Sequence, residues 1–112
     1  MIRVAFFRKE GRIVGFESEG HAGYADSGSD IVCAAVSALL VNCANTIEEV
    51  ARVSPAVREN EEAGFLSLRL PDTQDEAAEH DAQVILASTE IGINGIAQQY
   101  PGFVRVSSRI RR

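Results

Sequence analysis

The chain has 112 residues, of which 46% are hydrophobic, enough to bury the core of one domain without disulfides or a metal. Sixteen acidic residues against eleven basic ones give a formal net charge of −5, which argues against broad binding to nucleic acids or anionic membranes. The N-terminal MIRVAFF meets Arg8 and Lys9 too early for a signal peptide, and no stretch approaches the ~20 apolar residues of a membrane span. We therefore expect a single cytoplasmic domain over residues 1–112.

A β-hairpin is predicted at the N-terminus. Residues 2–8 and 12–18 are rich in β-branched and aromatic side chains, and Glu10-Gly11 between them is a turn signal. Gly15 in the second strand indicates a bulge or a close approach of another backbone.

A loop follows the hairpin. Residues 19–29 have a loop composition, with Gly20, Gly23 and Gly28 among polar side chains. Loops of this length often carry function or move. Because glycines make the backbone permissive, we expect this loop to become ordered only when a ligand binds.

A long helix is predicted from residue 31 to about residue 52. Asp30 suits the N-cap position, because its carboxylate can accept the backbone N–H of Val32 or Cys33. The segment is apolar on nearly all sides until Glu48, which is typical of a buried helix. We expect it to be the central helix of the domain, or one that also packs on a partner subunit.

Both cysteines, Cys33 and Cys43, fall on this helix. Helix geometry separates them by about 15 Å along the axis, whereas a disulfide needs Cα atoms within ~7 Å. We therefore expect two free thiols, as is usual in a reducing compartment.

The second half of the chain begins with another predicted hairpin, residues 56–60 and 64–70. In the later strand, leucines alternate with other residues, so that one face looks buried. A second helix then runs to about residue 99, with Thr73 as its N-cap and Glu76 completing a capping box.

Glycine costs stability inside a helix, and we interpret Gly92 and Gly95 as positions where the second helix presses on another element. Residues 103–110 predict a final strand. The basic residues that bunch there, which we interpret as a solvated strand edge or tail, are Arg105, Arg109, Arg111 and Arg112. The element order ββαββαβ predicts an α+β fold, with a mainly antiparallel sheet and two helices packed on one face.

Three residues near the start of the first helix could carry chemistry: His21, Asp30 and Cys33. The positive end of a helix and a nearby imidazolium both stabilise a thiolate, and a histidine within reach can carry protons. Asp30 could also help to place the imidazole. Backbone N–H groups at the helix start, or that of Gly20, could form an oxyanion hole.

Other interpretations of these residues remain open. Spacing alone favours a buried structural cysteine near a loop histidine. Ser37, one turn after Cys33, could support the site by a hydrogen bond, although small-residue helix packing is the simpler role. His21, Asp26 and Cys33 could in principle hold zinc, but no Cys or His pair has metal-ligand spacing, so we expect no metal and no cofactor.

The sequence resembles the ribosomal-processing cysteine proteases, the Prp family. The resemblance rests on Gly20-His21-Ala22, on Tyr24-Ala25 and Gly28, and on the run from Asp30 to Leu39 (DIVCAAVSAL). The stretch from Ile96 to Pro101 (IAQQYP) is similar to the exit of that family's second helix.

The resemblance implies a specific activity. The family removes a short N-terminal extension from a large-subunit ribosomal protein, and its catalytic residues fall on Cys33 and His21. The family also forms homodimers. A mobile loop covers its substrate cleft, which here corresponds to Ala22, Gly23, Tyr24, Ala25, Asp26, Ser27, Gly28 and Ser29.

We therefore expect a cysteine endopeptidase in which the Cys33 thiolate attacks the scissile carbonyl, His21 handles the protons and water releases an acyl-enzyme. One alternative is a non-catalytic, ribosome-associated module whose loop clamps a peptide. Another is a structural dimer module in which the apolar helix is the interface. No membrane contact and no direct nucleic-acid binding are expected.

Overall fold

The computed structural model describes residues 1–26, 28–73 and 75–111. Its elements follow the order ββαββαβ, which confirms the sequence-based prediction. Their bounds are β1 (Ile2–Lys9), β2 (Arg12–Glu19), α1 (Ile31–Glu49), β3 (Ala56–Asn60), β4 (Phe65–Arg69), α2 (Glu76–Gln99) and β5 (Val104–Ile110).

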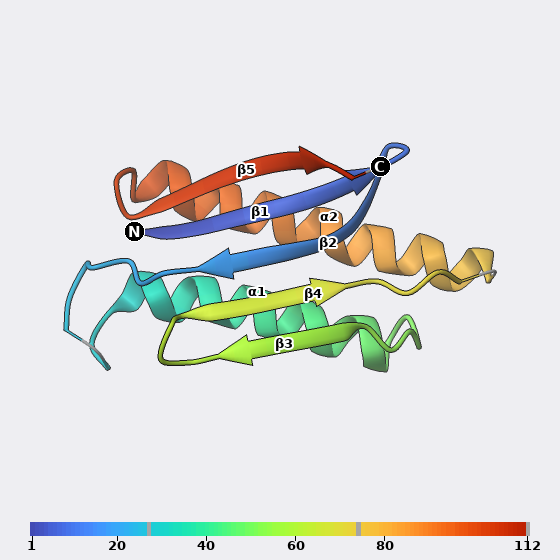
Figure 1. Ribbon diagram of the computed structural model, residues 1–112, viewed down its shortest axis with the longest axis horizontal. Coiled ribbons are helices and arrows are strands. Elements are labelled where there is room, and N and C mark those ends of the chain that lie inside the picture. The colour runs from blue at the N-terminus through green and yellow to red at the C-terminus, as the bar shows by residue number, and fades with distance from the viewer. Residues whose placement is uncertain (27, 74, 112) are drawn as a thin grey trace.

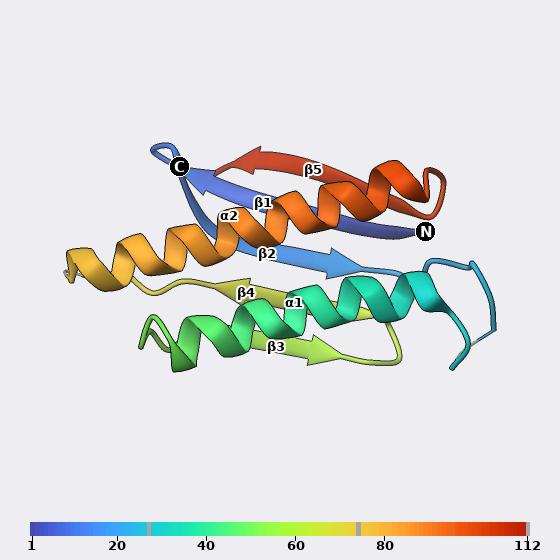
Figure 2. The same ribbon diagram turned by 180° about the vertical axis from the view of Figure 1, so that it is seen from behind.

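The strands form one sheet in the order β3-β4-β2-β1-β5. β1 pairs antiparallel with β2, as do β2 with β4 and β3 with β4, whereas β1 and β5 run parallel. Both helices lie on the same face of the sheet, and the other face is uncovered (Figures 1 and 2). The predicted α+β fold, with a mainly antiparallel sheet and two helices on one face, is confirmed.

The hydrophobic core fills the layer between the sheet and the helices. Phe6 and Phe16, on neighbouring strands, lie with their ring centroids 6.1 Å apart. The helices close over them with side chains that are almost fully buried, namely Leu40 and Ile47 from α1 and Leu86 and Ile93 from α2. Burying each such side chain contributes about 1.5–3 kcal/mol, so this layer dominates the stability of the fold.

Gly15 has the two features that its place in a strand predicts. Phe7 pairs with Gly15, but the next residue, Arg8, pairs with Ile13, so β2 has a bulge directly beside Gly15. A Cβ on Gly15 would also collide with the carbonyl oxygen of Leu68. The β2–β4 pairing therefore depends on a residue without a side chain at this point.

The helix α1 differs from the prediction of a helix buried on all sides. Only one side is fully buried, and the opposite side exposes the large hydrophobic residues Ile31 and Val41, followed by Val50 just past the helix end. The reason is architectural: a helix that lies on one face of a sheet, beside one other helix, leaves a side uncovered. Packing of that side on a partner subunit stays a prediction.

The expectation that no segment is apolar enough to span a membrane is also wrong for α1. Its 19 residues reach a mean hydropathy of 1.6 over an 18-residue window, which is sufficient by length and composition. Polar residues such as Asn42 and Asn45 interrupt the run without lowering its average enough. In this structure the helix packs one side on the sheet.

The start of α2 also differs from the prediction. The N-cap is Asp75, whose Oδ1 accepts hydrogen bonds from the backbone N–H groups of Ala77 and Ala78 at 3.0 and 3.1 Å. Thr73 instead accepts one from the N–H of Asp75 at 3.2 Å. Asp75 takes the cap because it stands directly before the first helical residue.

Of the two glycines inside α2, only one fits the predicted close contact. A Cβ on Gly92 would lie 2.9 Å from Leu39 Cδ1 of α1, so this glycine lets the two helices approach. A Cβ on Gly95 would have nothing within 4 Å, and the prediction is wrong there.

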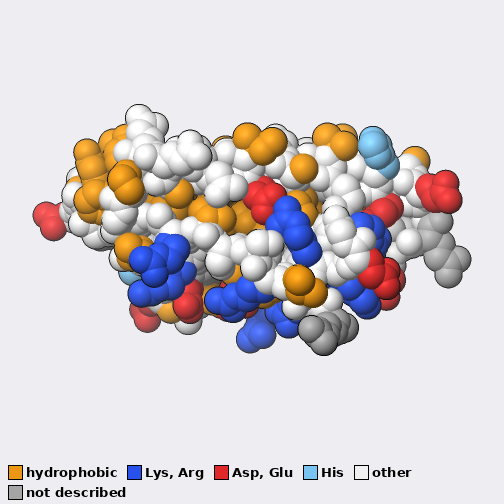
Figure 3. Space-filling view, turned by 90° about the horizontal axis from the view of Figure 1, so that it is seen from above, with side chains coloured by type: hydrophobic (Ala, Val, Ile, Leu, Met, Phe, Trp, Pro, Cys, Tyr) orange, Lys and Arg blue, Asp and Glu red, His pale blue; other side chains and the backbone are white. Residues whose placement is uncertain are grey.

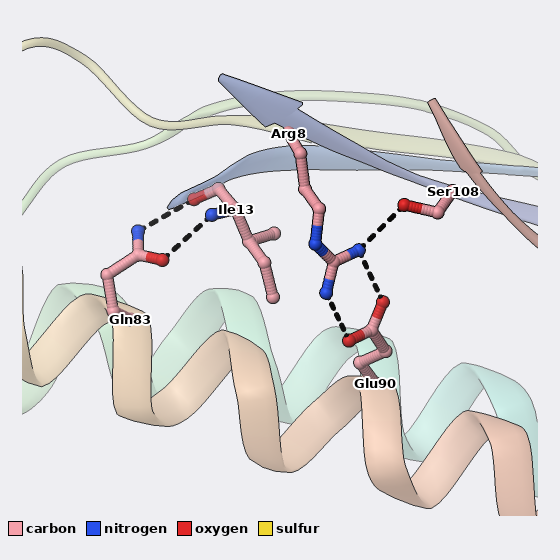
Figure 4. A network of polar contacts seen from close by, with 5 residues as sticks. All are labelled: Arg8, Ile13, Gln83, Glu90 and Ser108. Atoms are coloured by element: carbon pink, nitrogen blue, oxygen red, sulfur yellow. Dashed lines mark hydrogen bonds and ion pairs between the residues drawn. The ribbon is translucent and has the colours of Figure 1, made fainter. Parts of the chain in front are cut away.

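Two sets of polar contacts fix α2 on the sheet (Figure 4). The guanidinium of Arg8 donates to both carboxylate oxygens of Glu90, at 2.6 and 2.8 Å, and to Ser108 Oγ at 2.9 Å. The Gln83 amide bonds both backbone groups of Ile13, its N–H at 2.8 Å and its carbonyl at 2.7 Å. The amide thus provides partners for both backbone groups of a residue next to the bulge.

Candidate active site

The candidate site lies at the end of the molecule where β2 leads through its loop into α1. His21 follows β2 by two residues, and Cys33 lies in the first turn of α1. Both line one cavity of about 340 Å³, whose apolar wall includes Ile2, Leu40 and Leu66. The fold therefore brings the predicted thiol and imidazole to the same cavity.

Asp30 joins the loop to the helix through one carboxylate. Its Oδ1 accepts hydrogen bonds from the N–H groups of Val32 and Cys33, both at 3.0 Å, which confirms the predicted N-cap. Its Oδ2 accepts others from Tyr24 at 3.0 Å and Ala25 at 3.4 Å. The carboxylate thus positions the loop backbone and not, as one sequence-based suggestion had it, the His21 ring.

Two opposing effects act on the pKa of Asp30. Burial acts to raise it, but the hydrogen bonds from the backbone of Cys33, Tyr24 and Ala25, with a contribution from the Cys33 thiol, lower it below its ordinary value. An ionised Asp30 accepts hydrogen bonds on both oxygens, so the loop and the helix start are held together by a carboxylate and not by a carboxylic acid.

Cys33 is half-buried, and its sulfur receives a backbone donor from the loop. The N–H of Ala22, a buried residue, lies 3.3 Å from Cys33 Sγ. This hydrogen bond fixes the sulfur at the wall of the cavity, where a substrate can reach it.

His21 is exposed, and its ring is turned toward the β3–β4 connection. Its Nε2 lies 3.1 Å from the carbonyl oxygen of Glu62. Because a carbonyl oxygen only accepts hydrogen bonds, this contact requires the proton on Nε2 and leaves Nδ1 as the basic nitrogen of the neutral ring. The described structure contains no hydrogen bond between His21 and Cys33.

Comparison with known proteins identifies the family of the chain. The sequence matches the family model described as Cysteine protease Prp over residues 1–105. It is 30% identical, over 98 residues and 88% of each chain, to the ribosomal processing cysteine protease Prp of Bacillus subtilis strain 168. The chain belongs to the Prp family of cysteine proteases.

Two solved structures are similar over nearly their whole length. The ribosomal processing protease Prp of Staphylococcus aureus, in complex with a covalently linked product peptide, has a TM-score of 0.87 at 28% identity, covering 97% of this chain and 100% of that one. A protein of Streptococcus mutans has a TM-score of 0.86 at 30% identity, covering 99% and 96%. The chain is thus a cysteine protease, as its sequence predicted.

The other predicted site residues differ in whether they line the cavity and in how far they are exposed. Gly20 and Ser37 both line the cavity. Ser37 is exposed at its wall, and the described residues offer its hydroxyl no hydrogen-bond partner. In the predicted substrate loop, Ala22 is buried, whereas Gly23, Ala25, Asp26, Gly28 and Ser29 are exposed. Ser27 lies outside the described residues.

Tyr24 holds the middle of the predicted substrate loop in place. Its ring packs edge-on against Tyr100 and Phe103, with centroid distances of 5.6 and 5.3 Å. This aromatic cluster and the Asp30 carboxylate hold the first part of the loop in place. The expectation that the loop becomes ordered only on binding stays a prediction.

Three N–H groups at the helix start already have acceptors. Asp30 accepts those of Val32 and Cys33 on its carboxylate and that of Ala34, at 3.1 Å, on its backbone oxygen. These three groups are therefore not free to bind an oxyanion in this conformation, and an oxyanion hole at the helix start stays a prediction. Loop N–H groups such as that of Gly20 remain candidates.

Sequence reasoning missed the third wall of the site, the turn between β3 and β4. Gly64 has a φ of 63°, and a Cβ there would lie 2.5 Å from the Gly20 oxygen and 3.1 Å from His21 Cε1. The glycine at the end of the EEAG turn was the available signal. Its relation to His21 follows only from the β2–β4 pairing. Among the residues described, no three His, Cys, Asp or Glu side chains gather to hold a metal.

Proposed function

We propose that this protease removes the N-terminal extension of a large-subunit ribosomal protein, with Cys33 as its nucleophile and His21 as its proton carrier. One observation carries the proposal. A thiol that receives a backbone N–H and an imidazole with a basic Nδ1 line the same cavity. The names of its relatives, ribosomal processing proteases, support the substrate class.

The proposed reaction begins with transfer of the Cys33 proton to Nδ1 of His21. The thiolate attacks the scissile carbonyl carbon, a C–S bond forms, and the carbonyl oxygen becomes an oxyanion. The oxyanion collapses, the C–N bond breaks, and His21 gives its proton to the leaving amine. Water, deprotonated by His21, then hydrolyses the thioester and restores the thiol.

The proposal requires His21 to approach Cys33. In the structure its ring is held by the Glu62 carbonyl, a contact that it has to give up when substrate enters. Apo sites of this kind are often loosely aligned and tighten only with substrate. The position of His21 on a glycine-containing loop supports such a movement.

The test uses a peptide that copies the N-terminal junction of the large-subunit ribosomal protein from the same bacterium. It is incubated with wild type, Cys33→Ala, His21→Ala and the matched control Cys43→Ala, and products are identified by mass spectrometry. A single cut by wild type and Cys43→Ala only is expected. Equal cleavage by Cys33→Ala would refute the assignment of the nucleophile.

A second function has one observation in its favour. Because no hydrogen bond joins His21 to Cys33, the site could bind a peptide without cutting it. A binder would hold the junction peptide intact in wild type, with the same affinity as in Cys33→Ala. A thioester between Cys33 and the peptide, trapped by acid and seen by mass spectrometry, would exclude it.

We also propose a cytoplasmic homodimer. The free thiols Cys33 and Cys43 suit a reducing compartment. The exposed hydrophobic residues of α1, Ile31 and Val41, supply a surface for a second copy. Sedimentation at micromolar concentration tests the dimer, and a monomer would contradict it.

A further inference from the structure

The uncovered face of the sheet has a charge that the whole chain does not suggest. In β1, Val4 and Phe6 are buried under the helices, so the alternate residues Arg3 and Lys9 lie on the opposite side. The strand registers extend this alternation across the sheet. We call this uncovered side the open face.

Basic residues concentrate on the open face. Seven Lys and Arg residues without an ion pair lie on it, compared with three of the sixteen acidic residues, Glu17, Glu19 and Asp72. With Arg12 neutralised by Glu79, the open face thus has a formal charge of +4 in a chain of net charge −5. Its basic residues are Arg3, Lys9, Arg58, Arg69, Arg105, Arg109 and Arg111.

All seven side chains are exposed, and the described structure gives none of them an ion-pair partner. Two arginines do form ion pairs: Arg8 with Glu90 on the helical side, and Arg12, at the rim of the open face, with Glu79 of α2. Acidic residues on α2 therefore neutralise the helical side, while the open face keeps its charge. Like charges held together in this way repel one another, a cost that an anionic partner removes.

The shape of the open face suits a broad partner. It contains a hollow of about 700 Å³, lined by basic residues, by Glu17 and Asp72, and by apolar residues that include Phe7, Val14 and Pro71. The guanidinium carbon of Arg111 lies over the Phe7 ring, 4.0 Å from its centroid. Figure 3, viewed onto the β5 edge, shows Lys and Arg side chains gathered along the lower border, which is the open-face side.

The chemistry of the open face distinguishes between classes of partner. The large exposed hydrophobic residues nearest to it, Val57 and Ile110, pair in register with Leu68 and Arg8, whose side chains face the helices. A membrane surface or a protein interface usually needs apolar side chains to bury. A phosphodiester backbone needs only cations spread over a surface.

We propose that the open face binds the phosphate backbone of RNA. The choice of RNA over DNA rests on the proposed function, because a ribosomal protein substrate is an RNA-binding protein. The net charge of the chain argued against binding to nucleic acids. That value, however, is the sum of a basic open face and an acidic helical side. The cavity with Cys33 is walled by α1 residues on the helical side, so bound RNA leaves it accessible.

The test measures binding of a fluorescently labelled RNA hairpin by anisotropy at increasing salt. The variant Arg69→Gln/Arg105→Gln/Arg109→Gln removes three charges from the open face. Its matched control, Asn45→Glu/Ser88→Glu/Asn94→Glu, makes the same change in net charge at exposed positions of α1 and α2. Thermal melts verify that both variants fold.

Wild type is expected to bind in the range of non-specific complexes, about 10⁻⁴–10⁻⁶ M, with affinity falling steeply as salt rises. The open-face variant should bind at least about tenfold more weakly and lower the salt slope by about 2, whereas the control should change little. Equal loss in both variants, tighter binding to anionic vesicles or to duplex DNA than to RNA, or no binding by wild type would overturn the proposal.

Cleavage of the short junction peptide separates this proposal from the function on which it rests. The peptide carries no RNA, so the open-face variant should cut it at the wild-type rate. RNA binding without peptide cleavage would leave the open face as an RNA site and refute the protease assignment. Peptide cleavage without RNA binding would support the protease assignment and refute the RNA site.

Discussion

The two cysteines of α1 differ in their surroundings, although they share one helix. Cys33 is half-buried at the helix start, lines the cavity and accepts the Ala22 N–H. Cys43 is fully buried in the core, where burial raises the pKa of its thiol and a hydrogen bond to Thr89 lowers it by less. Two cysteines on one helix are thus expected to differ in reactivity, because their surroundings differ.

The largest expected effect is on catalysis. Cys33→Ala should lower kcat/KM for the junction peptide by about 10³-fold or more, because it removes the proposed nucleophile. Cys43→Ala should leave kcat/KM within a few-fold and lower only the melting temperature, because it opens a small cavity in the core. Steady-state cleavage and thermal melts of the two variants measure both effects. Similar losses of activity would remove the distinction between the cysteines.

Alkylation should separate the two thiols without any substrate. In the native protein at neutral pH, iodoacetamide should modify Cys33 about 100-fold faster than Cys43, because Cys43 is shielded and burial disfavours its thiolate. Peptide mapping by mass spectrometry gives the two rates. Denaturing urea serves as the control, since it should make the rates nearly equal. A native Cys33 as slow as Cys43 would favour the peptide-binding function.

The position of His21 can be tested at Gly64. Gly64→Ala adds a Cβ against the Gly20 oxygen and His21 Cε1, and it also strains a positive φ. The matched control Gly11→Ala has the same kind of strain, at φ 78°, with nothing within 4 Å. Gly11→Ala should cost about 1 kcal/mol of stability and Gly64→Ala more, because its Cβ also collides with a backbone oxygen, and only Gly64→Ala should lower kcat/KM, by about tenfold. Equal activity of the two variants would contradict the role of the turn.

The sequence predicted most of the fold because the signals were local. Alternation in the strands, the turn at Glu10-Gly11 and the Asp30 cap all act within a few residues. The cap of α2 was missed because Thr73 and Asp75 are both good caps, and only the helix start decides between them.

Long-range features could not be predicted in this way. The contact of His21 with Glu62 depends on β4 pairing with β2, far along the chain. The exposed side of α1 includes apolar residues, among them Ile31, Ala38 and Val41, so hydrophobicity alone did not predict that they are exposed. The net charge likewise did not predict the basic open face, because the strand registers decide on which side of the sheet each charged side chain lies.

A smaller effect is expected at Asp30. Asp30→Asn keeps the size of the side chain but leaves fewer acceptors for the four N–H groups of the loop and helix, so the melting temperature should fall by roughly 5 °C and cleavage by a few-fold. Folding lowers the pKa of Asp30, so its stabilising effect is complete above the ordinary pKa of 3.8 and disappears as pH falls through the folded value. Melts across this acid range should therefore converge for wild type and Asp30→Asn. A constant difference at all pH values would mean that the charge of Asp30 contributes nothing.

The smallest expected effect concerns Tyr24, which anchors the loop that supplies the Ala22 N–H to Cys33. Tyr24→Phe keeps both edge-on ring contacts and should cut the junction peptide like wild type. Tyr24→Leu removes the aromatic contacts, each worth about 0.5–1.5 kcal/mol, and should release the loop. The alkylation rate of Cys33 is the appropriate measurement, because it reports the surroundings of the sulfur without requiring substrate to bind. A faster rate in Tyr24→Leu would mean that the loop mainly shields the thiol, and a slower rate would mean that the Ala22 N–H mainly activates it. An unchanged rate would separate the aromatic anchor from the thiol and leave Asp30 as the sole link between loop and helix.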